Sequence, residues 1–134
     1  RIAIDAMGGD HAPAEIVLGA LEAARNDAGT HIILCGDQSA IRAHLPAMPP
    51  SNLEIHHCSQ IVEMNEAPAH AFRNKKDSGV AVATRLHKEG KADVCLSAGN
   101  TGAASTFALF TLGRIDGIDR PAIGTVFPTE NQPI

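Results

Sequence analysis

The fold is decided by one stretch of sequence, Val94-Cys95-Leu96-Ser97-Ala98-Gly99-Asn100-Thr101-Gly102. Its apolar start predicts a short strand, and the small residues that follow predict a tight turn. A helix is then expected over residues 102–112. A strand that passes through a short turn into a helix is the repeating unit of α/β proteins with parallel sheets.

The same alternation runs through the rest of the chain. Further strands are predicted over residues 2–5, 31–35, 53–57 and 122–127, and helices over 14–28, around 41–45, over 68–72 and from the cap at Asp77 or Ser78 to Gly90. The order is β–α, repeated about five times with short connections. This predicts a single three-layer α/β/α domain with a mostly parallel sheet and helices on both faces.

Composition bounds the class of protein. The 134 residues include no Trp, no Tyr and four Phe, so the core is expected to consist of small aliphatic side chains. A net charge of −4 argues against a nucleic-acid surface, which needs a basic stripe. No apolar run approaches the roughly 20 residues of a membrane span, and three cysteines without a CxxC pair indicate a reduced, cytoplasmic protein.

Two loops that follow predicted strands have the composition of a ligand site, because open α/β sheets bind ligands beyond the carboxyl ends of their strands. The first loop contains Gly8, Gly9 and Asp10. Paired glycines allow backbone N–H groups to approach a ligand closely. Asp10 either faces that ligand or only caps the following helix, and the residue types leave both readings open.

The second loop is residues 97–102, between a strand and a helix. Its small side chains leave N–H groups and hydroxyls exposed at the positive end of the helix dipole, which suits a phosphate or a carboxylate. The loop lacks both the Walker A ending and the GxGxxG spacing. The alternative is a structural turn in which Asn100 caps the helix.

Three other features have functional and structural readings. Lys75 and Lys76 belong to the densest basic cluster, which is either a solvated face or a site for phosphate or an acidic partner. His11 lies in the first loop and could act as a base, but no partner is placed beside it. The helix over residues 102–112 is apolar around most of its circumference, so it is expected to be buried on all sides by a larger protein or a second subunit.

Four motifs occur in order along the chain: residues 4–10 (IDAMGGD), 75–78 (KKDS), 97–102 (SAGNTG) and 113–121 (GRIDGIDRP). On these motifs the sequence closely resembles the PlsX family of bacterial phosphate acyltransferases, over essentially the whole chain. The resemblance implies transfer of a fatty acyl group from acyl carrier protein to inorganic phosphate. The acyl phosphate would then serve a membrane glycerol-3-phosphate acyltransferase.

The resemblance also implies a fold similar to phosphate acetyltransferases and isocitrate or isopropylmalate dehydrogenases. Further implications are a homodimer and loose contact with the inner face of the membrane. No cofactor and no metal ligand are predicted for this chain. Residues 1–134 would be the amino-terminal part of a longer domain. Site residues are assigned on the matching motifs: Asp10 and Asn100 as catalytic, and Gly8, Gly9, Ser97, Gly99, Thr101, Gly102, Lys75 and Lys76 as phosphate or oxyanion ligands.

Two departures from the family pattern are expected to matter. Gly79 stands where family members commonly have a second Ser, and His11 occupies a variable place, which removes it from the catalytic candidates. Competing hypotheses are a phosphate acetyltransferase-like enzyme that uses CoA, an acyl-carrier-protein binding module, and a non-catalytic fragment. Turnover with either thioester, or binding without turnover, separates them.

Overall fold

The structure, a computed structural model, describes residues 1–124. Four parallel strands form one sheet in the order β3-β2-β1-β4. The elements in chain order are β1 (Ile2–Asp5), α1 (Ala14–Asn26), β2 (Ile32–Gly36), α2 (Gln38–Arg42), β3 (Leu53–His57), α3 (Pro68–Asn74), α4 (Gly79–Lys88), β4 (Val94–Ser97) and α5 (Thr101–Leu112).

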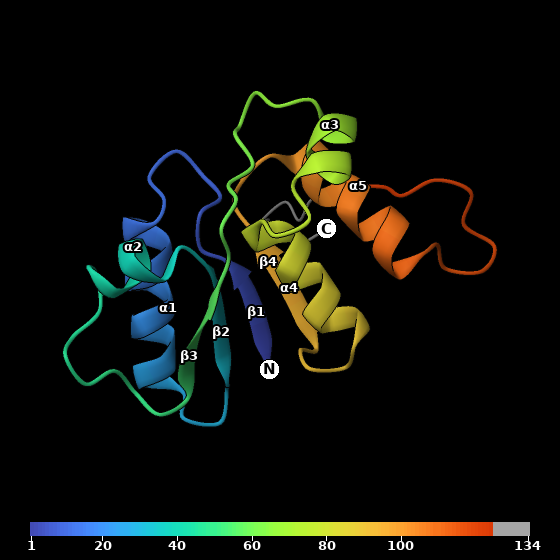
Figure 1. Ribbon diagram of the computed structural model, residues 1–134. Helices are drawn as coiled ribbons and strands as arrows, with labels where there is room; N and C mark the ends of the chain where they lie inside the picture. Colours follow the sequence, from blue (N-terminus) through green and yellow to red (C-terminus); the bar gives the residue numbers. More distant parts are fainter. Residues whose placement is uncertain (125–134) are drawn as a thin grey trace, which may run out of the picture.

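Helices cover both faces of the sheet, as predicted (Figure 1). On one face, α1 packs Val17 and Leu21 against the strands in an aliphatic core that also holds Ile32 and Leu34. On the other face, α4 supplies a core that includes Val82. The three-layer α/β/α prediction is therefore confirmed for the described residues.

A third core joins α3, α4 and α5, and it contains most of the rings of this ring-poor chain. Phe72 and Phe107 meet edge to face at 5.3 Å between centroids, and Phe110 lies 4.9 Å from Phe72. The fourth ring, Phe127, lies outside the described residues. The expectation of a purely aliphatic core holds for the two faces of the sheet but not for this cluster.

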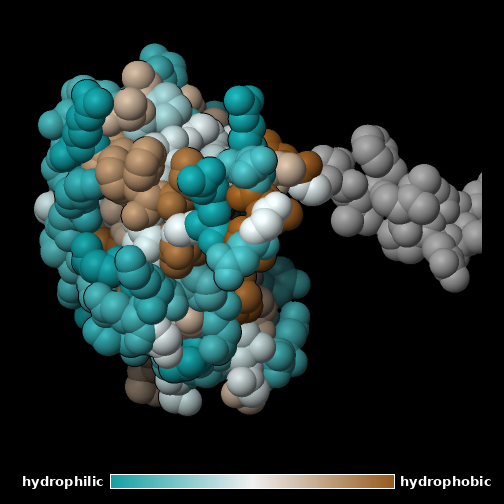
Figure 2. All heavy atoms as spheres, turned by 90° about the vertical axis from the view of Figure 1, so that its right-hand side faces the viewer, coloured by the Kyte–Doolittle hydropathy of each residue, from teal (hydrophilic) through white to brown (hydrophobic). Residues whose placement is uncertain are grey.

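Helix α5 is exposed along one side within the described residues, and its burial by a larger protein or a second subunit stays a prediction. Of α5 only Ala103 and Phe107 are buried, whereas Phe110 is 66% and Leu112 is 40% exposed. Figure 2 shows apolar side chains gathered on the side of the molecule that carries this helix. The cause is that α5 contacts α3 and α4 along one side only.

The apolar strand β4 is also partly exposed. It lies at the edge of the sheet, so Val94 is 52% and Leu96 is 55% exposed. Beside it, an apolar groove of about 590 Å³ runs between α1 and the sheet. The groove is lined by Ile16 of α1, Ile4 of β1 and Leu96 of β4.

Several element boundaries also differ. The helix predicted over residues 14–28 ends at Asn26. The strand predicted over residues 122–127 is absent from residues 122–124, and the rest of it lies outside the described residues. Within residues 1–124, no helix combines the length and the apolar character needed to cross a bilayer.

Candidate functional site

The order of the strands locates a crevice. From β1 the chain adds β2 and β3 on one side of the sheet and then places β4 on the other, so the order reverses between β1 and β4. Open α/β sheets bind ligands at such a reversal, beyond the carboxyl ends of the strands. At this point Asp5, the last residue of β1, is the register partner of Ser97, the last residue of β4.

The two predicted loops meet at this crevice. A Cβ on Gly99 would lie 2.9 Å from the Cα of Gly8, and a Cβ on Gly9, which has φ of 120°, would lie 3.3 Å from the carbonyl oxygen of Ala98. Only glycine permits this approach of one backbone to the other. We call this place, made by Asp5, Gly8, Gly79, Ser97 and Gly99, the glycine crevice.

Asp5 belongs to this crevice but is not among the site residues predicted from the sequence. Its carboxylate accepts a hydrogen bond from Ser97 Oγ at 2.8 Å and one from the Met7 amide at 3.3 Å. Burial raises the pKa of Asp5, while these two hydrogen bonds act in the opposite direction. The available signal was a charged residue at the end of a central apolar strand, directly before a glycine pair.

Asp10 and Thr101 are exposed. The alternative reading of Asp10 as a cap is wrong, because α1 begins after Pro13 without a side-chain cap. Packing explains the glycine at position 102, because a Cβ there would lie 2.8 Å from Pro68 Cγ, where α3 crosses α5.

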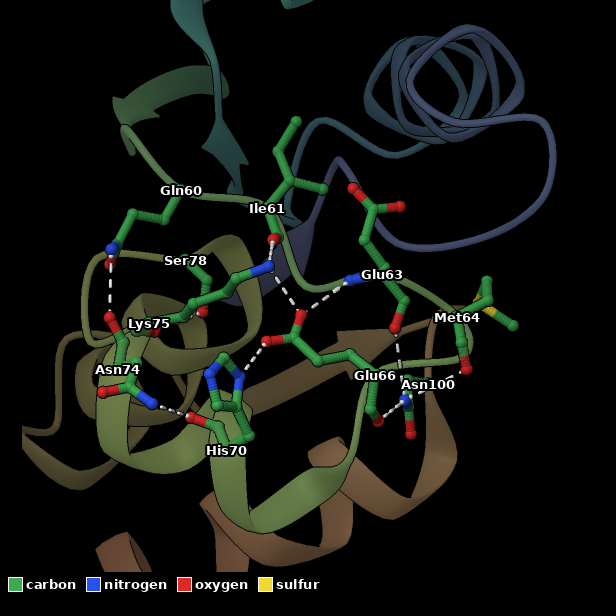
Figure 3. A network of polar contacts seen from close by, with 10 residues as sticks. All are labelled: Gln60, Ile61, Glu63, Met64, Glu66, His70, Asn74, Lys75, Ser78 and Asn100. Carbon is green, nitrogen blue, oxygen red and sulfur yellow. Dashed lines mark hydrogen bonds and ion pairs between the residues drawn. The ribbon is translucent and has the colours of Figure 1, made fainter.

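Asn100 is the N-cap of α5, as its structural reading predicted. Its Oδ1 accepts from the Ala103 amide at 2.9 Å. Its Nδ2 contacts the carbonyl oxygens of Glu63, Met64 and Glu66 at 3.2, 3.1 and 2.8 Å. Both ends of the amide are thus engaged within the chain, and the side chain holds the loop after β3 against the start of α5 (Figure 3).

Lys75 belongs to the same arrangement. Its Nζ donates to the Ile61 carbonyl and to Glu66 Oε2, both at 2.5 Å, and Glu66 also pairs with His70 Nδ1 at 2.8 Å. These partners lower the pKa of Glu66 to about 2. We call Glu66, His70, Lys75 and Asn100 the Glu66 network, which Figure 3 shows in full.

Lys76 is separate from both clusters in its contacts. Its Nζ lies 3.2 Å from the centroid of the Phe72 ring, a cation–π geometry. The structure therefore brings Gly8, Gly9, Ser97 and Gly99 together at the crevice. It joins Lys75 to Asn100 through Glu66 and gives Lys76 a different neighbour.

Comparison with known proteins assigns the chain to a family. The family model described as "fatty acid synthesis protein" matches residues 1–134. The chain belongs to this family. The chain is 55% identical over 130 residues to a phosphate acyltransferase of Desulfitobacterium hafniense strain DCB-2, and 52% identical over 130 residues to one of Desulforamulus reducens. Each match covers 96% of this chain and 39% of the relative.

A third relative, the phosphate acyltransferase of Nostoc punctiforme, is 54% identical over 132 residues and is covered to 38%. The chain thus spans about two fifths of the length of these relatives. The family membership agrees with the resemblance seen in the four motifs, and the names of the relatives indicate acyl transfer. The likeness to the isocitrate and isopropylmalate dehydrogenase fold stays a prediction.

Proposed function

We propose that residues 1–134 carry the phosphate-binding part of an acyltransferase, which moves a fatty acyl group from the thioester of acyl carrier protein to inorganic phosphate. The observation that carries the proposal is the meeting of two glycine loops at the strand-order reversal. The names of the relatives add support, since each is a phosphate acyltransferase.

The crevice suits a small oxyanion. The first amides of α5, those of Thr101 and Gly102, lack acceptors within the helix, as in any helix start. They add their donors to the positive end of the helix dipole, which favours an anion. In this proposal Asn100 and Lys75 position the loops around the anion, and Asp10 lies at its entrance.

The reaction follows from the chemistry of the reactants. A phosphate oxygen attacks the thioester carbonyl, a C–O bond forms and the C–S bond breaks. Hydrogen phosphate brings the proton that the leaving thiolate takes up, so the products are an acyl phosphate and a free thiol. Phosphate is itself the nucleophile, and aligning it with the carbonyl supplies the rate enhancement without a covalent enzyme intermediate.

The proposal extends to partners. Acyl carrier protein donates the acyl group, and a membrane glycerol-3-phosphate acyltransferase consumes the acyl phosphate. A cytoplasmic homodimer in loose contact with the inner face of the membrane fits a soluble donor and a membrane-bound consumer.

The test measures acyl phosphate and free thiol produced by the natural protein from acyl carrier protein thioester and phosphate. Ser97→Ala is expected to lower the rate about tenfold or more, because the turn at Gly99 loses the hydroxyl that holds it. Ser39→Ala, the same change on the exposed face of α2, is the matched control. Turnover with a CoA thioester alone, or carrier-protein binding without turnover, would contradict the proposal.

A further inference from the structure

Asp5 raises a question that acyl transfer by itself does not answer. It is the one acidic or basic residue in the described chain that is buried, with 5% exposure, and it lies in the crevice proposed for an anion. A buried carboxylate repels an anion strongly because little solvent screens the two charges. A phosphate site with this carboxylate inside needs a compensating contact.

The hydrogen bonds of Ser97 indicate what that contact is. A hydroxyl has one donor and two acceptor positions. The proton of Ser97 is committed to Asp5 Oδ2 at 2.8 Å, and one acceptor position receives the Gly99 amide at 3.1 Å. One acceptor position of Ser97 Oγ is left, and it can be filled only by a group that donates a proton.

The surroundings hold Asp5 and Ser97 in this arrangement. A Cβ on Gly8 would lie 2.6 Å from Asp5 Oδ2 and 2.9 Å from Ser97 Oγ, so backbone encloses both groups on that side. The Met7 amide occupies Asp5 Oδ1. An ionised carboxylate only accepts hydrogen bonds, so Ser97 cannot turn its proton toward a ligand without leaving Asp5 unsatisfied.

We propose that Asp5, acting through Ser97, makes the crevice specific for an oxyanion that carries a proton, namely hydrogen phosphate, and excludes sulfate. This inference rests on the proposed function, because it concerns the phosphate of that reaction. Near neutral pH inorganic phosphate keeps a P–OH group that can donate to Ser97 Oγ. Sulfate has the same shape but no proton, so it meets a lone pair and a buried negative charge with nothing to offset them.

Asp5 is in this role a specificity-determining residue that acts through its neighbour. Sites that contain a fixed polar group reject an isostere lacking the matching group far more strongly than apolar pockets reject a size difference. The expected discrimination is therefore large, about a hundredfold or more in dissociation constant between phosphate and sulfate.

The experiment measures binding of inorganic phosphate and of sulfate to the natural protein by titration calorimetry, and sulfate inhibition of acyl-phosphate formation. The native protein should prefer phosphate about a hundredfold. In Asp5→Asn the preference should fall below about tenfold, because the amide can donate to Ser97 and release the hydroxyl proton toward the ligand. Asp116→Asn, the same change in an exposed turn, should retain the native preference.

Ser97→Ala provides a second route, since it keeps the carboxylate and removes the relay. Its affinity for phosphate should fall, because the acceptor for the P–OH group is removed, with the fold checked by circular dichroism. Equal affinity of the native protein for the two anions would overturn this inference and leave the proposed function standing. Absence of phosphate binding together with absence of phosphate-dependent turnover would overturn the proposed function as well.

Discussion

The glycine crevice and the Glu66 network both lie beyond the carboxyl ends of the strands and are built in opposite ways. The crevice depends on side chains that are missing, since glycines bring two loops and the start of α4 against the Asp5 carboxylate. The Glu66 network depends on long side chains that reach across a loop and pair with one another. The crevice leaves an acceptor position of Ser97 open, whereas the polar groups of the Glu66 network bind to one another and to the backbone.

This difference indicates that the crevice is suited to contact a ligand and that the Glu66 network supports a loop. In the network, both ends of the Asn100 amide and the Lys75 ammonium have partners within the chain, so their contacts hold the loop after β3 in place. In the crevice, Ser97 keeps an acceptor position. We therefore expect substitutions in the network to act first on loop order, and substitutions in the crevice to act on folding or on anion choice.

The largest expected effect is at Gly79, where the start of α4 packs against the crevice. A Cβ there would meet the Asp5 carboxylate and lie 2.7 Å from the Cys35 carbonyl oxygen. Gly79→Ala should lower the free energy of unfolding by about 3 kcal/mol in urea titrations, because neighbouring backbone must shift. Gly19→Ala, with no atom within 4 Å of the new Cβ, should instead stabilise α1 by about 0.5–1 kcal/mol.

A moderate effect is expected at Asn100, which separates capping from loop support. Asn100→Ala removes the cap of α5 and the contacts to three carbonyls, so it should cost about 2 kcal/mol and speed hydrogen exchange of amides 61–66. Asn100→Asp keeps the capping oxygen and loses the donors. It should therefore speed exchange in the loop while α5 stays protected, and slow exchange in the loop of both variants would contradict this role.

The smallest expected effect is the pH dependence of stability, which differs between the carboxylates of Glu66 and Asp5. The pKa of Glu66 is about 2 in the fold, below its ordinary value of 4.5, so its stabilising contribution is present above about pH 4.5 and lost as the pH falls toward 2. Burial raises the pKa of Asp5 above its ordinary 3.8, so the folded state holds that proton more tightly than the unfolded state does. Stability therefore falls as the pH rises above about 3.8.

Urea titrations between pH 2 and pH 5 check this opposition. The stability difference between the native protein and Glu66→Gln should shrink as the pH falls, whereas the native protein should gain stability relative to Asp5→Asn. Equal slopes for the two variants would remove the electrostatic contrast between the clusters.

Much of the fold was predictable because its signals are local. Apolar runs bounded by small residues gave the four described strands, and the glycines of the two loops marked the crevice. The exposure of Phe110 and Leu96 was not predictable from the composition of their own segments. Burial depends on which neighbouring elements cover a surface, and that is a tertiary property.

The site was predicted in part for a similar reason. Lys75 and Glu66 are nine residues apart and lie in a segment without periodicity, so no helical spacing announced their ion pair. Asp5 was assigned to its strand, and its contact with Ser97 spans 92 positions. Sequence patterns locate loops well, but the partners of a side chain are decided by strand order.

The cluster of Phe72, Phe107 and Phe110 has a practical consequence for anyone who observes this protein. The chain contains no Trp and no Tyr, so absorbance and emission above the phenylalanine range are almost free of background. A single tryptophan introduced at Phe110, whose ring is 66% exposed beside Phe72, would report the contact between α3 and α5 without interference. The same spectral silence makes concentration measurements at 280 nm unsuitable for this chain.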